Sequence, residues 1–215
     1  MERVFRLVDS PLGWLTLVGE AGRLVGLFVD GQRYRPADAE FGVRVESGFE
    51  SLVEQLGEYF VGRLTRFDVA LGFGGTEFQN RVWRALVEIP YGQTVTYGGL
   101  AGLLGVPRAS RAVGAANGRN RVSIVVPCHR VVGADGSLTG YAGGVERKRW
   151  LLDLESGRVP LGLEAVPLPR GSAVGVSGRR RSGGRRSDHG VSRASWRCVP
   201  IASRRRRWCC VVRGG

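Results

Sequence analysis

A cysteine and a histidine stand side by side in the chain, as Cys128 and His129. They are the only residues of their types among the first 169 positions. A thiolate is the reactive form of cysteine, and a neighbouring imidazole can accept the thiol proton near neutral pH. The pair could therefore attack an electrophile. The plain alternative is a structural cysteine, because free cysteine is among the most buried residue types.

A β-branched apolar run, 124–126, leads into this pair, and Pro127 ends the run. Such a run predicts a buried strand, and proline interrupts strand pairing because it has no backbone N–H group. We therefore expect Cys128 and His129 at the end of a buried strand, where the backbone turns.

The charge of the chain is concentrated in its last part. The 215 residues carry a formal net charge of +13. Residues 1–169 hold 19 Lys and Arg against 18 Asp and Glu, whereas residues 170–215 hold 13 arginines and one acid, Asp188. The basic character therefore describes the tail, and any argument for nucleic-acid binding must come from the body.

Three of the four cysteines, Cys198, Cys209 and Cys210, also lie in the tail. The body cannot form an internal disulfide, which is typical of a reducing cytoplasm. Apolar runs stay below the ~20 residues of a membrane span, and no signal-peptide pattern opens the sequence. We expect a cytoplasmic protein with no membrane segment. The sequence has no spacing of ligands that predicts a metal site.

Residues 1–72 predict a small α/β domain. Three short apolar segments separated by turn residues indicate an antiparallel β-meander. Residues 49–60 place apolar side chains on one helix face, 67–71 is typical of a further strand, and 30–47 is expected to be a loop. This domain shows no catalytic constellation, so we expect it to support the rest of the chain. The three segments of the meander are 4–8, 14–18 and 24–29.

Residues 76–160 predict a second, mostly helical domain. Thr76 is a good N-cap for its first helix. Two short helices, 97–104 and 109–116, are joined by a glycine-containing turn and have the size of a helix-turn-helix. The second helix is rich in Ala and Gly and carries Arg111. Small side chains let a helix approach a surface closely, so Arg111 could enter a duplex. The alternative is a solvated arginine on a packing helix.

The remaining segments are a turn, a loop, a helix and the tail. Residues 133–136 are typical of a hairpin turn, 140–144 of a flexible glycine-rich loop, and 145–154 of a helix. In residues 170–215, arginine runs without apolar periodicity predict a disordered tail. Two explanations of that tail stay open, a shifted reading frame of GC-rich DNA and a nonspecific nucleic-acid arm.

The motifs of residues 76–155, taken together, resemble those of the O6-alkylguanine-DNA alkyltransferases (methylated-DNA–protein-cysteine methyltransferases). The strongest is Pro-Cys-His-Arg-Val at 127–131, which has matching flanks on both sides. The amino-terminal part is compatible with the family's smaller domain, and the tail lies outside the resemblance. The flanking motifs are Phe78-Gln-x-x-Val82-Trp83, Ile89-Pro-Tyr-Gly-x-Thr94-x-Thr-Tyr97-Gly98, Arg111-Ala-Val-Gly114, Asn120 and Gly140-Tyr-x-Gly-Gly144-x-x-x-Lys148-x-x-Leu151-Leu152-x-x-Glu155.

The resemblance implies DNA repair by direct reversal. Family members flip the damaged nucleotide into a pocket and move its alkyl group to their own cysteine, once and irreversibly. By this resemblance Cys128 accepts the methyl group from O6-alkylguanine, and from O4-alkylthymine. His129 would take the thiol proton through a water, and Glu155 would orient the imidazole. Tyr97 would donate toward ring N3 of the leaving guanine, and Lys148 would assist near the site.

The resemblance also implies residues that bind DNA and the flipped base. Arg111 would fill the gap left by that base, and the small residues around it would let the helix enter the minor groove. The carbonyls of Cys128 and Val131 would accept hydrogen bonds from the guanine amine, and the glycine-rich loop would wall the pocket. The implied binding residues are Arg111, Gly114, Ala115, Asn120, Val131, Tyr141, Ala142 and Gly143.

Three positions or features depart from the family pattern. Arg121 follows Asn120, where the family usually has proline, which puts the turn before the active-site segment in doubt. Ala142 stands where some members have serine, so a hydrogen bond to guanine O6 is lost. The amino-terminal zinc ligands of some members are absent, and we expect no metal.

Three other functions could use the same residues: a transcription regulator, a damage sensor and a cysteine hydrolase. A helix-turn-helix regulator would read bases through residues 97–117, but its second helix lacks the Asn, Gln or Arg array for that task. A damage sensor without transfer would need Cys128 replaced. A cysteine hydrolase would use the same Cys–His pair but turn over many times, so stoichiometric inactivation separates it from repair.

The expected fold is α/β (α+β). A small amino-terminal domain with an antiparallel sheet and a helix precedes a mostly helical, winged-helix-like domain that carries the site. We expect a monomer that acts on double-stranded DNA with alkylated bases. No cofactor is expected, because the lesion itself is the electrophile.

Overall fold

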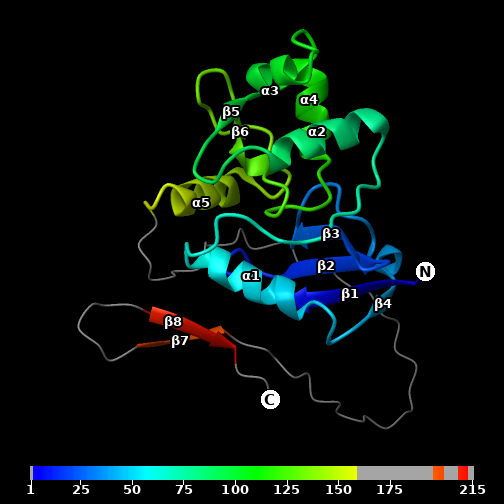
Figure 1. The fold of residues 1–215 in the computed structure, drawn as a ribbon, viewed down its shortest axis with the longest axis vertical. Helices are drawn as coiled ribbons and strands as arrows, with labels where there is room; N and C mark the ends of the chain where they lie inside the picture. The colour runs from blue at the N-terminus through cyan, green and yellow to red at the C-terminus, as the bar shows by residue number, and fades with distance from the viewer. Residues whose placement is uncertain (1, 159–195, 201–207, 213–215) are drawn as a thin grey trace, which may run out of the picture. The chain divides into compact units, whose positions relative to one another are not determined.

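The computed structural model describes residues 2–158, 196–200 and 208–212 (Figure 1). The chain divides into two compact units, residues 1–166 and residues 167–215. The first unit contains the candidate site. Among the described residues, no helix is long and apolar enough to span a membrane.

The first half of this unit is a four-stranded sheet in the order β3-β2-β1-β4. The first three strands form the predicted antiparallel meander. β4 pairs parallel with β1, so the sheet is mixed and not purely antiparallel. β4 and a 3-10 helix, η1, lie in the predicted loop 30–47, and both are too short to leave a periodic pattern. The bounds are β1 Arg3–Val8, β2 Leu15–Glu20, β3 Arg23–Val29, η1 Asp38–Phe41 and β4 Val43–Arg44.

The helix α1 (Glu50–Phe60) lies where the apolar spacing predicts it. The predicted strand at 67–71 is wrong, because this segment makes only a single bridge, between Leu71 and Leu24 of β3. A physical reason is that residues 67–71 are not the only segment bonded to the outer edge of β3, because residues 121–123 are bonded to it as well. Leu27, three residues further on, donates from its backbone to Arg121 and accepts from Ser123.

The second half of the unit is mostly helical, as predicted. Thr76 caps α2 as expected: its hydroxyl accepts from the Gln79 backbone at 3.3 Å, and the Gln79 side chain accepts from the Thr76 backbone at 3.0 Å. Trp83 Nε1 donates to the Ala116 carbonyl at 2.9 Å and thus joins α2 to α4. The bounds are α2 Glu77–Val87, β5 Val95–Thr96, α3 Tyr97–Leu103, α4 Ser110–Gly118, η2 Cys128–Arg130, β6 Val131–Val132 and α5 Val145–Glu155.

The predicted strand before Cys128 is wrong. Residues 123–125 form a tight turn, and Ile124 has a positive φ of 72°, which is unusual for a β-branched residue. Backbone hydrogen bonds from Val125 to Ser123 and from Val126 to Val122 close the turn. The apolar run is therefore buried by surrounding elements and not by strand pairing. The carbonyl of Arg121 accepts from the Leu27 backbone, so β3 holds the residue that follows Asn120.

Two further predictions differ from the structure in part. Residues 133–136 form a turn, closed by backbone hydrogen bonds, but no hairpin, because β6 pairs in parallel with β5. In the tail, β7 (Trp196–Pro200) and β8 (Trp208–Val212) pair antiparallel, which the sequence analysis did not predict. Their Trp and Val residues have high strand propensity. The rest of the predicted disordered tail lies outside the described residues.

Both halves of the first unit share one apolar core. Leu15 and Leu27 of the sheet, Leu56 of α1, Leu86 of α2 and Leu151 of α5 belong to it, and each is at most 1% exposed. Figure 1 shows α2, α3 and α4 on the opposite side of the unit from β1 and β2, with β5 and β6 beside α3. The Tyr59 hydroxyl of the first half donates to Glu155 of the second, so the candidate site is in contact with both halves.

Candidate active site

Cys128 is the first residue of η2, directly after Pro127, and its surface is 3% exposed. Asn120 Nδ2 donates to the Cys128 Sγ at 3.1 Å and to the Val126 carbonyl at 2.8 Å. Asn117, in the last turn of α4, donates to the Cys128 carbonyl at 3.2 Å. Two buried amides thus hold the thiol and its backbone in place.

The surroundings of Cys128 favour a protonated thiol. Burial raises the pKa of the thiol to about 11, and the hydrogen bond from Asn120 and the positive charge of Lys148 only partly oppose this. Attack on an electrophile therefore requires a group that takes the thiol proton as the reaction proceeds.

The buried thiol should be protected from small alkylating reagents. We expect Cys128 in the folded, DNA-free protein to react with iodoacetamide at pH 7 about a hundredfold more slowly than an ordinary cysteine, because the thiolate fraction falls tenfold per unit of pKa. The rate should rise with pH toward the pKa of about 11. Peptide mass spectrometry after timed labelling separates Cys128 from the tail cysteines, and urea-unfolded protein is the control. Fast labelling of the folded protein at pH 7 would contradict this geometry.

The residue that follows Cys128 is His129. Its side chain is completely buried, and Nε2 lies 2.9 Å from Oε1 of Glu155, the last residue of α5. Burial lowers the pKa of the His129 imidazole, against the attraction of Glu155. Burial alone would raise the pKa of Glu155, but hydrogen bonds from His129 and Arg130 outweigh it and hold that pKa well below its usual range.

These protonation states decide the tautomer of His129. An ionised carboxylate only accepts hydrogen bonds, so Nε2 carries the imidazole proton and Nδ1 keeps a free lone pair. Nδ1 is buried and has no hydrogen-bond partner among residues 2–158. Two consecutive residues therefore carry a protonated thiol and a basic nitrogen that has no hydrogen-bond partner among residues 2–158.

The Glu155 carboxylate is fixed by five hydrogen bonds. Oε1 accepts from His129, from Arg130 Nη2 at 2.8 Å and from the Tyr59 hydroxyl at 2.6 Å. Oε2 accepts from Arg130 Nε at 2.9 Å and from the Gly92 backbone at 3.2 Å. A carboxylate offers about four lone-pair positions, so this one is saturated and cannot rotate freely.

Lys148 and Tyr97, both predicted site residues, meet at one backbone carbonyl. Lys148 is fully buried, and its Nζ donates to the carbonyls of Val131 at 2.6 Å and Thr139 at 2.7 Å. The Tyr97 hydroxyl donates to the same Thr139 carbonyl at 3.0 Å. Burial lowers the pKa of Lys148 to about 8 and raises the pKa of Tyr97, so both remain donors at neutral pH.

The glycine-rich loop is joined to both halves of the unit. Tyr141 is buried, and burial followed by the nearby Cys128 raises its pKa well above the usual value. Gly143 lies so close to the Tyr141 ring that a Cβ would approach it to 2.7 Å. The Ala142 carbonyl accepts from the Arg33 backbone at 2.9 Å, and Arg147 donates to the Gly143 carbonyl at 3.0 Å. The loop thus has a defined packing beside the thiol.

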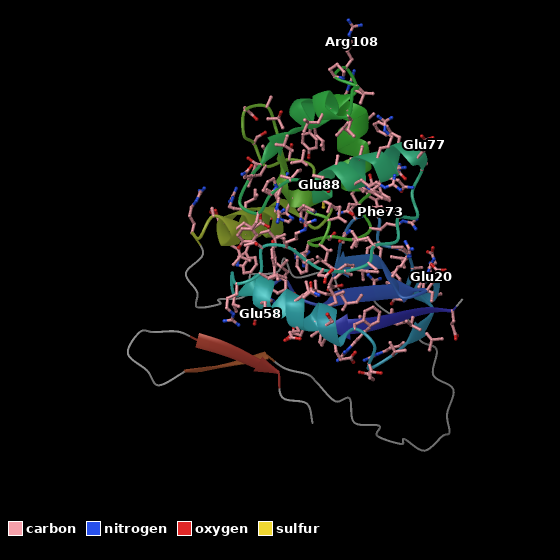
Figure 2. All side chains as sticks on the ribbon, in the orientation of Figure 1. Glu20, Glu58, Phe73, Glu77, Glu88 and Arg108 are labelled. Carbon is pink, nitrogen blue, oxygen red and sulfur yellow. The ribbon has the colours of Figure 1, made fainter. Side chains whose placement is uncertain are left out.

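One face of the helix α4 is exposed and carries mostly small residues. Arg111 and Ala115 are exposed, and Gly114 is half-buried beside the Tyr97 ring. Arg108, in the turn between α3 and α4, projects away from the body in Figure 2. Arginines and small residues therefore share this end of the unit, which has the composition expected for contact with DNA.

For four residues of the site, the sequence alone predicted no functional role. Arg130 matches the family motif, but no role was predicted for it. Tyr59 is an aromatic residue on an amphipathic helix face, which normally indicates core packing. Asn117 and Gln32 are amides in a helix and a loop, and only their position in space connects them to Cys128. No local pattern could have identified these three.

Gln32 links the sheet to the segment that holds the thiol. Its Oε1 accepts from the Ser123 hydroxyl at 2.9 Å and from the Val29 backbone at 3.2 Å. Its Nε2 donates to the carbonyl of Asn120 at 3.4 Å. Gln32 is 6% exposed, so these groups depend on it for their hydrogen bonds. The amino-terminal half therefore helps to place the amide that contacts the Cys128 sulfur.

Replacing Gln32 with methionine should loosen this link while keeping the volume of the side chain. We expect the free energy of unfolding to fall by about 2 kcal/mol, because buried partners are left without hydrogen bonds. Urea unfolding followed by fluorescence measures the change. Gln93→Met, at an exposed position, is the control and should change stability by less than about 0.5 kcal/mol. Equal stability of the two variants would show that the link is dispensable.

Family models match both halves of the first unit. The family described as 6-O-methylguanine DNA methyltransferase matches twice, with its ribonuclease-like domain at residues 4–73 and its DNA binding domain at residues 77–157. The chain belongs to the O6-methylguanine-DNA methyltransferase family. The predicted family, fold class, DNA-repair function and methyltransferase activity are therefore confirmed.

Relatives within the methyltransferase family are similar over most of their length. The methylated-DNA–protein-cysteine methyltransferase of Mycobacterium tuberculosis is 51% identical over 159 residues, which are 74% of this chain and 96% of the relative. A crystal structure of that organism's OGT in complex with DNA has a TM-score of 0.68 at 50% identity and covers 73% of this chain and 95% of its own. The O6-methylguanine-DNA methyltransferase of Pyrococcus kodakaraensis is 27% identical, with a TM-score of 0.53, over 71% of this chain and 98% of its own.

Proposed function

We propose that Cys128 is the residue that receives the alkyl group, in a single irreversible transfer from O6-alkylguanine in double-stranded DNA. The observation that carries this assignment is the buried Nδ1 of His129, which has no hydrogen-bond partner among residues 2–158, while Nε2 of the same ring is bonded to Glu155. His129 directly follows the buried Cys128 in the chain. A protonated thiol needs such a base, and an imidazole held by a carboxylate is suited to the task.

The reaction forms one bond and breaks one. The sulfur of Cys128 attacks the methyl carbon, the S–C bond forms, and the O6–C bond breaks with its electron pair going to guanine. The thiol proton passes to Nδ1 of His129, through a water, and the resulting imidazolium is stabilised by Glu155. The departing guanine takes up a proton, for which Tyr97 is the proposed donor. The product is a thioether, which has no leaving group that would regenerate the thiol.

The base pocket is proposed to lie between the glycine-rich loop and η2. The carbonyls of Cys128 and Val131 face protein donors at rest, and each retains a second lone pair for the guanine amine. The Tyr97 hydroxyl would break its hydrogen bond to the Thr139 carbonyl and donate to the base. Lys148 would keep its hydrogen bonds to the carbonyls of Thr139 and Val131. Tyr141, Ala142 and Gly143 would form the wall of the pocket.

DNA would bind along the exposed face of α4. Arg111, Gly114 and Ala115 lie on or beside that face, and the small side chains would allow close approach to the minor groove. Arg111 would occupy the space left by the flipped nucleotide. In this proposal Asn120 places the Cys128 sulfur, and the protein acts as a monomer in the cytoplasm. O4-alkylthymine is a second proposed substrate.

Mass spectrometry of the intact protein after incubation with an O6-methylguanine duplex tests this function. The expected result is one methyl group per protein molecule, located on the Cys128 peptide, with no further reaction on fresh duplex. An unmodified duplex is the control and should leave the protein unchanged. Repeated turnover without a protein adduct would indicate a hydrolase, and tight binding without an adduct would indicate a damage sensor.

A further inference from the structure

The Tyr59 hydroxyl reaches the candidate site from the other half of the unit. It lies 2.6 Å from Oε1 of Glu155, although the two residues are 96 positions apart. Tyr59 is completely buried. Burial, followed by the negative charge of Glu155, raises the pKa of Tyr59 well above its usual value, so the hydroxyl stays protonated and donates. A helix of the amino-terminal half thus contacts the carboxylate that orients the base.

Aromatic packing fixes the direction of this hydroxyl. The Tyr59 ring lies 5.2 Å from that of Phe67 and 6.0 Å, edge to face, from that of Tyr91, measured between centroids. The next residue, Phe60, packs on Trp150 of α5 at 6.0 Å. The helices α1 and α5 are therefore in contact at two points, and Figure 1 shows them on the same side of the unit.

Tyr59 and His129 bind the same oxygen atom. Oε1 of Glu155 also accepts from Arg130, so three donors share its negative charge. Each donor that shares the charge weakens the attraction of the carboxylate for a proton on the imidazole. Together with Arg130 and the Gly92 backbone, Tyr59 restricts rotation of the carboxylate that is bonded to the imidazole.

We propose that Tyr59 is a positioning residue for methyl transfer: by sharing Oε1 of Glu155 it keeps His129 aligned and in its neutral, proton-accepting form. This inference rests on the proposed function of His129 as the base. It assigns the amino-terminal half a part in the chemistry, beyond the support that its lack of catalytic motifs suggests.

The charges around this pair set the direction of the effect. The imidazole is influenced by Glu155, which favours its charged form, and by Arg130 and Lys148, which oppose it. Removing the Tyr59 hydroxyl leaves more negative charge for the imidazole and should raise its pKa. Transfer needs the neutral imidazole, so the acid limb of the rate profile should move to higher pH. The groups that face Glu155 are Tyr59 on α1, Tyr91 and Gly92 after α2, and His129 and Arg130 on η2.

Tyr59→Phe removes the hydroxyl and keeps the ring. The experiment measures the single-turnover rate of methyl transfer from a saturating O6-methylguanine duplex between pH 5 and pH 9. We expect a roughly tenfold lower rate at pH 6 to 7, the size of one hydrogen bond to a charged group. We also expect the acid limb to shift up by about half a unit to one unit, with partial recovery at pH 9.

Two variants separate positioning from general destabilisation. Phe60→Leu loosens the same helix and leaves the hydroxyl, so its thermal midpoint should fall while its pH profile stays in place. In a Glu155→Gln background, adding Tyr59→Phe should change the rate less than twofold, because the charge that Tyr59 shares is gone. An unshifted profile in Tyr59→Phe, or an equal effect in both backgrounds, would overturn the inference. If the unaltered protein itself takes up no methyl group, the proposed function fails instead.

Discussion

Serine in place of Cys128 is expected to abolish methyl transfer while the protein remains folded and keeps its affinity for an O6-methylguanine duplex. The hydroxyl is close in size to the thiol and can accept the same hydrogen bond from Asn120. It is far less acidic, however, and a histidine whose pKa is already lowered by burial cannot activate it as it does a thiol. We expect the single-turnover rate to fall by at least about 10⁴-fold. Transfer of an isotopically labelled methyl group measures it, and fluorescence anisotropy of a labelled duplex measures binding.

The tail provides the control for this prediction. Cys198, Cys209 and Cys210 can be replaced together by serine, and this triple variant should transfer one methyl group at the rate of the unaltered protein. Methyl uptake by Cys128→Ser, or a methyl group on a tail cysteine, would show that another residue is the acceptor. Loss of duplex binding by Cys128→Ser alone would show that the thiol also contributes to recognition.

The helices were the most predictable part of the fold. Thr76 and Gln79 carry a capping box in their own sequence, and apolar spacing outlines α1 and α2 without help from distant residues. The run before Cys128 was predicted as a strand for the same local reason, and that was wrong. The residues just before the run are instead held by β3, through hydrogen bonds such as that from the Ser123 backbone to the Leu27 carbonyl, which no local pattern reveals.

The residues of the site also fall into those that the sequence could indicate and those that it could not. Cys128, His129 and Glu155 could be proposed from residue types and family spacing, because they lie on segments whose order is fixed in the chain. Tyr59 could not, since an aromatic residue on an apolar helix face has the same pattern whether its hydroxyl meets solvent or a carboxylate. Gln32 reaches Asn120 across 88 positions, so its role follows from how the halves pack. Long-range hydrogen bonds between buried polar groups are the part that sequence periodicity does not encode.

Neutralising Glu155 should separate its part in catalysis from its part in stability. Glu155→Gln keeps the shape but cannot stabilise an imidazolium, so we expect methyl transfer to slow by about a hundredfold or more. Glu155→Ala also leaves the buried Arg130 guanidinium without its carboxylate, which typically costs about 3–5 kcal/mol of folding free energy. Single-turnover kinetics and urea unfolding measure the two effects. The control is Glu58→Gln. Glu58 forms an exposed ion pair with Arg63 and is labelled on α1 in Figure 2, so this substitution should change the transfer rate and the stability little.

The pH dependence of stability gives Glu155 a second, independent test. Its pKa in the folded protein lies well below the unfolded value, so the stability it contributes is present above about pH 4.5 and is lost as the pH falls toward the folded pKa. Urea unfolding between pH 3 and pH 7 should therefore show a steeper acid loss for the unaltered protein than for Glu155→Gln. Equal slopes would mean that the carboxylate is not held ionised by Arg130 and His129. In that case the tautomer assigned to His129, and with it the unprotonated Nδ1 that is proposed to accept the thiol proton, would lose its physical basis.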